Sequence, residues 1–427
     1  MDRMDRLPAL RADIELLPAR LDGRDVFVVR DPLGIVKRNA ALSAEVAPYL
    51  PLFDGCSTVG DLQIVMMRRH GGSLIFRSDA EGIVEELSRV GILQTDGYRE
   101  AKERIVREFT ESQERAAALA GAAYPENPGA LGALLDRILS LPPLSSEGLD
   151  GPPCALATPH IDLRVAERTY AAAYRAIRGT APSAVLLLGT GHSLGETRYC
   201  ISGKTFSTPL GRVPADRDAV ARIRAAAGRA LAPDDFAHRN EHSLEFQVLF
   251  LQRIFPMEEV PILPVLCGQM EDLFGKARSP LDDPGIASFV EAVSAWLDGP
   301  AGKPLVVAGV DLSHVGPKFG DSSTGRSLEE ACRAYDRQVL DALVAGDASA
   351  FFQAGALARN RYRICGFSAL WTLLAVLPEI RGRVLDYEVW HEEPTRSAVS
   401  FAAVSFTRTG GKRETVRRRG QDSLNGR

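Results

Sequence analysis

Short apolar runs alternate with amphipathic helical stretches along residues 155–406, and this alternation constrains the fold more than any other feature of the chain. Runs that are apolar at every position are typical of strands buried on both faces of a sheet. The pattern therefore predicts an α/β domain in three layers, with helices on both faces of the sheet. The runs lie at residues 155–157, 184–189, 260–266, 305–310, 384–390 and 397–406.

The length of 427 residues allows more than one domain. Residues 1–98 have the pattern of a small α+β domain of winged-helix type, and residues 99–119 that of a helical linker. The α/β domain is expected to span residues 120–408. Residues 409–427 are polar and rich in arginine, which predicts a disordered tail.

The pattern within the first 98 residues is a hairpin followed by helices. A strand is expected at 26–30, a turn at 31–34 and a return strand from residue 35. Helical patterns follow at residues 43–53, 58–69 and 78–90.

The composition is ordinary for a water-soluble protein, with 45% hydrophobic residues, 25% charged residues and a net charge of −4. We expect no nucleic-acid partner, because no basic excess is present. No apolar run reaches the roughly 18 residues that a membrane span needs, and the amino-terminal residues are too charged for a secretory signal. The six cysteines are scattered without a CxxC motif, which favours reduced thiols and a cytoplasmic location.

Histidine is scarce, at seven residues, so the position of each one is informative. His160, His192 and His314 each follow a strand-like run, and His242 begins a helical stretch. Loops beyond the carboxyl ends of strands build the site in open α/β sheets. These histidines can therefore converge, although they lie far apart in the sequence.

Neutral imidazole binds zinc, iron, copper and nickel, and a thiolate adds affinity for softer ions. Cys365 begins a helix after a loop, where the helix amino terminus lowers a thiol pKa. Two histidines and one anion would leave open positions on a metal for substrate or dioxygen. Each residue also has a structural interpretation: a histidine at a strand end can be a core residue, and a lone cysteine a small buried apolar one.

A series of short motifs between Tyr124 and Phe406 resembles the Memo family, known in prokaryotes as protein B of the AmmeMemoRadiSam system. The motifs occur in order and without large gaps. They are Tyr124-Pro125, Pro159-His160, Gly189-x-Gly-His192, Glu241-His242-Ser-x-Glu245, Pro261-Ile-x-Pro-Val265, Asp311-x-Ser-His314, Ile364-Cys365-Gly366 and Ser397-x-Val-Ser-Phe-Ala402.

The resemblance implies a phosphorylase/hydrolase-like α/β fold related to class III extradiol dioxygenases, which use non-haem Fe(II). It implies metal ligands at His160, His192 and Cys365, with iron expected and copper or zinc as alternatives. It also implies that His314 acts as the acid/base. A cysteine in place of the carboxylate ligand of the dioxygenases argues against ordinary ring cleavage. The other implied residues are Asp311 and His242, as catalytic groups, and Glu241 and Glu245 around the ligands.

The chain departs from the family pattern at two of these motifs. Ile161, Asp162 and Leu163 follow Pro-His where the family has Ala-Gly-Tyr, and a single His192 stands where the family has two adjacent histidines. Neither change removes an expected ligand. The carboxylate of Asp162 could hydrogen-bond a ligand histidine or cap the following helix, and the sequence leaves both interpretations open.

The amino-terminal part resembles PqqD-like modules, which bind leader peptides. The resemblance rests on residues 42–58 and 84–93, and it implies a peptide ligand for residues 20–98, bound by strand addition to a sheet edge. A generic winged helix and a DNA-binding one are the alternatives. The absence of a dense lysine and arginine stripe disfavours DNA.

Three functions follow from these features. The first is a redox or dioxygenase-like iron enzyme that acts with a radical SAM protein and an AMMECR-like protein, the partners that the resemblance implies. The second is a non-catalytic adaptor that brings a peptide to the radical SAM partner. The third is a zinc-dependent hydrolase, which ranks last because no GxSxG nucleophile motif is present.

Overall fold

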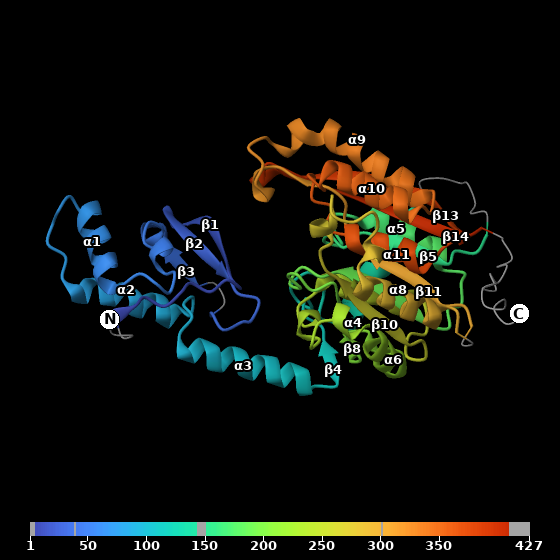
Figure 1. Cartoon of the computed structure of the whole chain (residues 1–427), viewed down its shortest axis with the longest axis horizontal. Helices are drawn as coiled ribbons and strands as arrows, with labels where there is room; N and C mark the ends of the chain where they lie inside the picture. Colours follow the sequence, from blue (N-terminus) through green and yellow to red (C-terminus); the bar gives the residue numbers. More distant parts are fainter. Residues whose placement is uncertain (1–4, 38–39, 143–150, 300–301, 410–427) are drawn as a thin grey trace, which may run out of the picture. The chain divides into compact units, whose positions relative to one another are not determined.

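The six strand-like runs between residues 155 and 406 all belong to one mixed sheet of eight strands (Figure 1), to which the unpredicted short strands at residues 199–201 and 314–315 also belong. The computed structural model describes residues 5–37, 40–142, 151–299 and 302–409. The chain divides into a first unit, residues 1–111, and an α/β unit, residues 112–427. The predicted disordered tail lies, apart from residue 409, outside the described residues.

Four parallel strands form the centre of the sheet, in the order β5, β11, β6, β10. A long hairpin, β13–β14, and the short strands β7 and β12 extend it on both sides by antiparallel pairing. Because parallel strands place their carboxyl ends at one edge, the four central strands present their following loops together. The strands are β5 (Ala155–Thr158), β6 (Val185–Thr190), β7 (Tyr199–Ile201), β10 (Ile262–Cys267), β11 (Leu305–Gly309), β12 (His314–Val315), β13 (Ile380–Glu392) and β14 (Ser397–Arg408).

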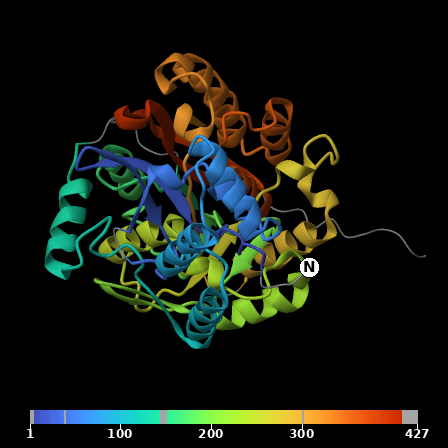
Figure 2. The same cartoon turned by 90° about the vertical axis from the view of Figure 1, so that its left-hand side faces the viewer.

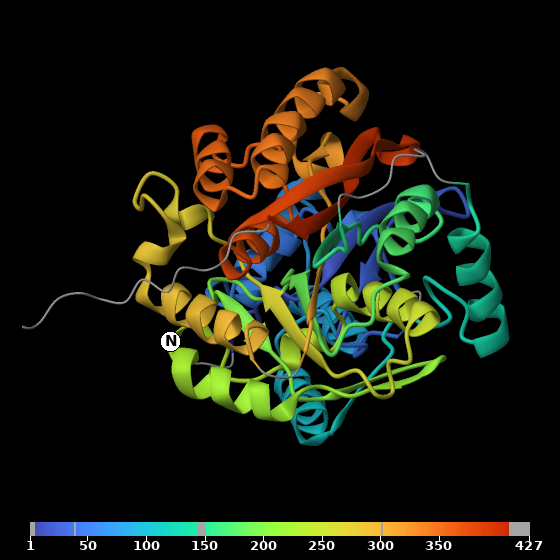
Figure 3. The same ribbon diagram turned by 90° about the vertical axis from the view of Figure 1, so that its right-hand side faces the viewer.

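Helices cover both faces of this sheet, as the sequence predicts (Figure 3). Alternate residues of β6 show the two faces: Val185 and Leu187 pack into one core, and Leu186 and Leu188 pack into the other. The helices α4 (Pro128–Leu139), α5 (Glu167–Ile177) and α7 (His242–Ile254) cover the first face. The second is covered by α6 (Arg217–Ala227), α8 (Pro284–Leu297), α9 (Gly325–Val344), α10 (Ala348–Ala358) and α11 (Phe367–Val376).

A second, small sheet joins β4 (Glu114–Ala116), β8 (Thr205–Thr208) and β9 (Gly211–Val213). The helix expected to continue to residue 119 instead ends earlier, as α3 (Asp96–Glu111). Residues 114–116 are extended because they pair in parallel with β8.

The first unit has a three-stranded antiparallel sheet and helices (Figure 2). Its strands are β1 (Glu15–Leu21), β2 (Arg24–Arg30) and β3 (Ala41–Ser43). The expected strand at 26–30 lies within β2, but its hairpin partner is β1, and the return strand is β3 rather than a segment from residue 35. The reason is Asp31, whose carboxylate accepts the backbone N–H groups of Leu33 and Val36 and so holds that segment in a turn.

Two of the three helices predicted for this unit are present, α1 (Val59–Arg69) and α2 (Arg77–Val90). Thr58 and Asp61 cap α1 reciprocally. The helix predicted at 43–53 is wrong, because only two single 3₁₀ turns form there. Pro48 and Pro51 explain this, since proline lacks the N–H that a continuous helix needs.

Among the described residues no helix is both long and apolar enough to cross a membrane.

Candidate metal centre

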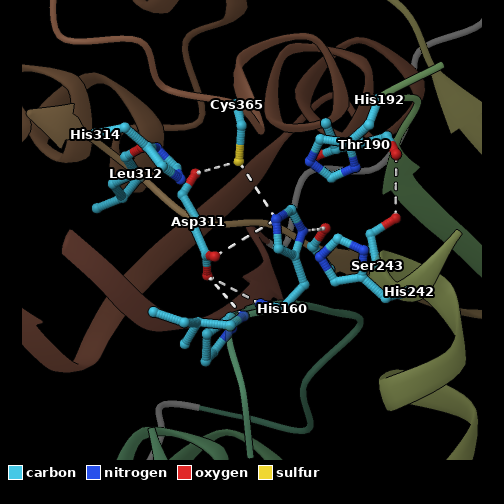
Figure 4. A network of polar contacts seen from close by, with 12 residues as sticks. His160, Thr190, His192, His242, Ser243, Asp311, Leu312, His314 and Cys365 are labelled. Carbon is cyan, nitrogen blue, oxygen red and sulfur yellow. Dashed lines mark hydrogen bonds and ion pairs between the residues drawn. The ribbon is translucent and has the colours of Figure 1, made fainter. Parts of the chain in front are cut away.

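Three site residues occupy the same position relative to three neighbouring strands. His160 lies two residues after β5, His192 two residues after β6, and Asp311 two residues after β11. These strands are parallel neighbours in the sheet, so the three side chains meet at its carboxyl edge (Figure 4).

Cys365 reaches the same place from the loop before α11, whose N-cap is Gly366. A Cβ at Gly366 would overlap the side chain of Val310, so only glycine lets this loop approach β11 so closely. The Sγ atom of Cys365 lies 3.4 Å from Nε2 of His160 and 3.7 Å from the carbonyl oxygen of Asp311.

The ligand atoms of His160, His192 and Cys365 all lie within 4.8 Å of one another, close enough to share one metal ion. The same holds for two overlapping sets, Asp311–His314–Cys365 and His192–Glu241–His242. The ligand assignment made from the sequence stays a prediction, and the geometry supports it by bringing the three side chains together.

Each candidate histidine has its Nδ1 atom engaged by the protein. Nδ1 of His160 lies 3.0 Å from the carbonyl oxygen of Gly309, and Nδ1 of His192 lies 3.0 Å from the carboxylate of Glu241. Carbonyl and carboxylate oxygens only accept, so Nδ1 of each ring carries the hydrogen. Nε2 of each ring is therefore the atom that would bind a cation in place of its proton, as in metal sites whose histidines are oriented by such partners.

The charges around His160 favour a cation at this point. Burial alone would lower the pKa of His160, but Asp311 and Cys365 outweigh it and raise the pKa to about 9. Burial would raise the pKa of Cys365, but His160 and His314 hold it well below its ordinary value. Oδ2 of Asp311 lies 3.4 Å from Nε2 of His160. Nε2 of His160 thus faces two acidic groups, the carboxyl of Asp311, whose pKa burial raises, and the thiol of Cys365.

Glu241 is the buried carboxylate behind His192. It accepts N–H hydrogen bonds from Nδ1 of His192 and from the backbone of Ser243, the latter at 2.9 Å, and so also caps α7. Burial would raise the pKa of Glu241, but His192 and His242 hold it well below its ordinary value. Burial would lower the pKa of His192, but Cys365 and Glu241 raise it to about 10.

His242 stacks on His192 with ring centroids 5.0 Å apart and planes 12° apart. Burial and the neighbouring His160 lower the pKa of His242 to about 4, which keeps this ring neutral near pH 7. Its side chain is 37% exposed and that of His192 is 42% exposed, so this side of the site is open to solvent.

His314 begins β12 and lies on the opposite side of Cys365 from His192 (Figure 4). Its Nδ1 donates to the carbonyl oxygens of Leu312, at 2.9 Å, and Arg363, at 3.1 Å, which leaves Nε2 free to accept a proton.

A buried carboxylate, Asp336 of α9, supports the segment that contains His314. It accepts hydroxyl hydrogen bonds at 2.6 Å from Ser313 and from Ser400, and at 2.7 Å from Tyr387. These three bonds tie the residue before His314 to β13 and β14.

Two expected members of the site lie elsewhere. The carboxylate of Glu245 is buried between Arg115, Tyr124 and the backbone N–H groups of residues 118 and 119. The carboxylate of Asp162 accepts the backbone N–H of Arg164 at 2.9 Å and pairs with the same guanidinium. It therefore organises a turn five residues before Glu167, where α5 begins, and in the described part of the chain its hydrogen bonds go to Arg164 and not to a candidate ligand.

Two features were not expected from the sequence. Arg115 is buried and contacts the segment that leads into α7, yet nothing distinguishes it from the other members of a set of 51 lysines and arginines. His238 is 1% exposed and packs edge-on against Phe206. Burial lowers the pKa of His238 to about 3.

Comparison with known proteins identifies relatives along most of the chain. A family profile described as "Memo-like protein" matches residues 115–405. A MEMO1 family protein of Aquifex aeolicus is 31% identical over 90% of this chain and 96% of its own length. One of Thermus thermophilus is 31% identical over 80% of this chain and 97% of its own length. One of Archaeoglobus fulgidus is 26% identical over 67% and 97%, respectively.

Proposed function

The chain belongs to the Memo family, and we propose that it is a metal-dependent redox protein. In this proposal His160, His192 and Cys365 hold a single iron ion. The observation that carries the proposal is the convergence of two imidazoles and one thiol within 4.8 Å, with Nδ1 of both rings already engaged.

The donor set fits iron in kind and number. Two neutral imidazoles and one anion match the count of the two-histidine, one-carboxylate sites of non-haem Fe(II) oxygenases, which keep positions open. The thiolate replaces the carboxylate and also suits copper and zinc. Iron bound there would supply a redox-active Lewis acid beside the substrate.

The protein's own groups would bind the substrate and move a proton. The Nδ1 hydrogen of His314 is directed at two carbonyl oxygens, so in the neutral ring Nε2 carries the lone pair. That nitrogen can accept a proton from a hydroxyl or amine of a substrate. The substrate would enter from the side where His192 and His242 are exposed.

Metal loading of the full-length protein tests the ligand set. Anaerobically prepared protein is titrated with Fe(II), and bound iron is measured together with the affinity. We expect about one iron per chain in the parent and a loss of binding in His160→Ala and Cys365→Ser. Matched controls are His391→Ala and Cys154→Ser, which change residues outside the cluster and should bind as the parent does. Equal binding by the ligand variants would refute the set.

The same preparation separates the iron proposal from the zinc hydrolase. Protein loaded with Zn²⁺, Cu²⁺ or Fe²⁺ is compared in oxidase assays and in hydrolase assays. A zinc-bound water becomes a nucleophile near neutral pH, so hydrolysis restored by zinc alone would replace our proposal.

We further propose that the first unit binds a peptide and that the chain acts with a radical SAM protein and an AMMECR-like protein. This second role is supported by strand β1, which in the described residues pairs only with β2 and so forms one edge of its sheet. Leu17 and Leu21 of this strand are 44% and 48% exposed. An extended peptide can add to such an edge through backbone hydrogen bonds and apolar side-chain contacts.

Fluorescence anisotropy of labelled peptides encoded beside the gene for this chain tests that role in the full-length protein. We expect binding that weakens in Leu17→Asp. The control is Leu357→Asp on α10, where an equally apolar side chain is 86% exposed. Equal effects of the two substitutions, or no peptide bound by the parent, would count against it.

A further inference from the structure

The first turns of α7 contact both loops that carry the candidate histidine ligands. Oγ of Ser243 donates to the carbonyl oxygen of Thr190, two residues before the histidine that follows β6, at 3.2 Å. Nε2 of Gln247 donates to the carbonyl oxygen of Pro159, next to the histidine that follows β5, at 3.0 Å. The start of α7 therefore sets the relative position of these two loops.

A single buried guanidinium fixes the segment that leads into this helix. Nε of Arg115 donates to the carbonyl oxygen of His238 at 2.9 Å, and Nη2 donates to that of Glu241 at 2.8 Å. Nη1 pairs with the carboxylate of Glu245, one turn into α7. The planar fork of arginine can make these three contacts at once, whereas a lysine ammonium cannot match their geometry.

The ion pair between Arg115 and Glu245 is buried, and the carboxylate accepts several further hydrogen bonds. The side chains of Arg115 and Glu245 are 1% and 0% exposed. Glu245 also accepts the backbone N–H groups of Ala118, at 2.9 Å, and Leu119, at 3.0 Å, and the hydroxyl of Tyr124. Such a buried pair resists rearrangement, because moving one member would leave the other charge buried, unpaired and without water.

We propose that Arg115 is a positioning residue for the candidate metal site. It holds the backbone of Glu241, and the carboxylate of the same residue holds Nδ1 of His192. Glu241 alone thus connects Arg115 to His192, because its carbonyl oxygen accepts from the guanidinium and its carboxylate accepts from the imidazole. This inference rests on the proposed function, because it assigns Arg115 to the iron site that we propose there.

The test compares Arg115→Lys with Tyr124→Phe in the full-length protein. Lysine keeps the charge opposite Glu245 but cannot hold both carbonyl oxygens. Tyr124→Phe removes a hydrogen bond from the same carboxylate and leaves the contacts to residues 238 and 241 intact. Circular dichroism and thermal unfolding establish that both variants are folded.

Two readouts are taken, Fe(II) affinity and hydrogen exchange of the metal-free protein. We expect Arg115→Lys to weaken Fe(II) binding at least about tenfold, the lower end for the loss of a group that orients a ligand. We also expect faster exchange in a peptide covering residues 238–243. Tyr124→Phe should leave both quantities at the parent value. A folded Arg115→Lys protein with parent-like affinity and exchange would overturn the inference, as would equal changes in both variants.

The two readouts distinguish this inference from the proposed function. If the parent itself binds no Fe(II), the proposed metal site fails, and the exchange of residues 238–243 alone decides whether Arg115 fixes this segment. If the parent binds Fe(II) and Arg115→Lys binds it equally well, the metal site stands and the positioning role fails.

Discussion

Replacing Glu241 with glutamine should weaken metal binding while leaving the protein folded. Glutamine has nearly the same size and keeps one oxygen, which can still accept the backbone N–H of Ser243 and cap α7. It loses the negative charge, and its amide nitrogen is a donor. His192 would therefore lose the charged acceptor at its Nδ1 and keep at most the neutral amide oxygen that also caps α7, so its hydrogen is held on Nδ1 less firmly.

The size of the effect follows from the contacts that are lost. Nδ1 of His192 lies 3.0 and 3.1 Å from the two oxygens of Glu241, and the carboxylate gives this contact ionic character. A hydrogen bond to a charged group contributes about 1.5–3 kcal/mol. Loss of a group that orients a metal ligand costs about 10- to 100-fold in affinity, or about 1.4–2.7 kcal/mol. The two estimates agree, so we expect a dissociation constant raised by one to two orders of magnitude.

Competition between the protein and a chromogenic Fe(II) chelator measures this constant under anaerobic conditions. The matched control is Asp162→Asn, which removes a carboxylate two residues from His160. That carboxylate is paired with Arg164 and should leave the affinity unchanged. An affinity for Glu241→Gln within about threefold of the parent, far below the expected range, would refute the reasoning. So would an equal loss in Asp162→Asn.

Three further predictions concern stability and the approach of Cys365. Burial would raise the pKa of Asp31, but hydrogen bonds from Arg11 and nearby backbone N–H groups lower it overall. A lowered folded-state pKa stabilises the first unit above the unfolded-state pKa of about 3.9, and that stabilisation is lost as the pH falls through the folded-state pKa. Hydrogen exchange of residues 26–36 should therefore show a loss of stability at acid pH in the parent and a smaller pH dependence in Asp31→Asn. Gly366→Ala should abolish Fe(II) binding and lower the melting temperature, because its Cβ would overlap Val310; parent-like binding would contradict this. Asp336→Asn should cost about 1–3 kcal/mol in denaturant unfolding followed by tryptophan fluorescence, because it replaces one of the two oxygens that accept hydroxyl hydrogen bonds with an amide nitrogen that only donates. An unchanged unfolding midpoint would show that these bonds contribute little.

The sequence predicts the central strands well, because strands buried on both faces appear in it as long runs of consecutive apolar residues. Strands β6 and β10 are six residues each and buried at every position, so their apolar runs stand out. Strands β4 and β9 have three residues each and give no such signal. Strand β4 forms because β8, which is distant in the sequence, pairs with it, and β9 pairs with β8 across the short turn at residues 209–210.

The first unit shows how one side chain can override a local pattern. An apolar pair follows the turn at residues 31–34, as in a hairpin, yet the carboxylate of Asp31 captures two backbone N–H groups beyond it. Strand β2 consequently pairs on one side with β1, which precedes it, and on the other with β3. An aspartate at a turn is readily seen in a sequence, but which N–H groups it binds is decided by the folded chain.

At the candidate site, a position just after a strand indicated which histidines lie together. The one-turn spacing of two glutamates did not indicate which of them contacts a histidine. His160 and His192 could be placed because each follows a strand of the parallel sheet at the same interval. Glu241 and Glu245 are one turn apart and look equivalent in the sequence. In the structure the first contacts His192 and the second contacts Arg115, because the guanidinium is inserted between the lead-in to α7 and the helix.

That division of the two glutamates has a chemical consequence. A carboxylate that binds Arg115 has its charge neutralised and its lone pairs used, so Glu245 can support the backbone but cannot polarise an imidazole. The carboxylate of Glu241 contacts His192, His242 and the backbone N–H of Ser243, and its charge acts on His192. The buried arginine therefore separates a carboxylate that supports the backbone from one that contacts a candidate ligand. We expect substitution of Glu245 to lower folding stability and substitution of Glu241 to lower metal affinity.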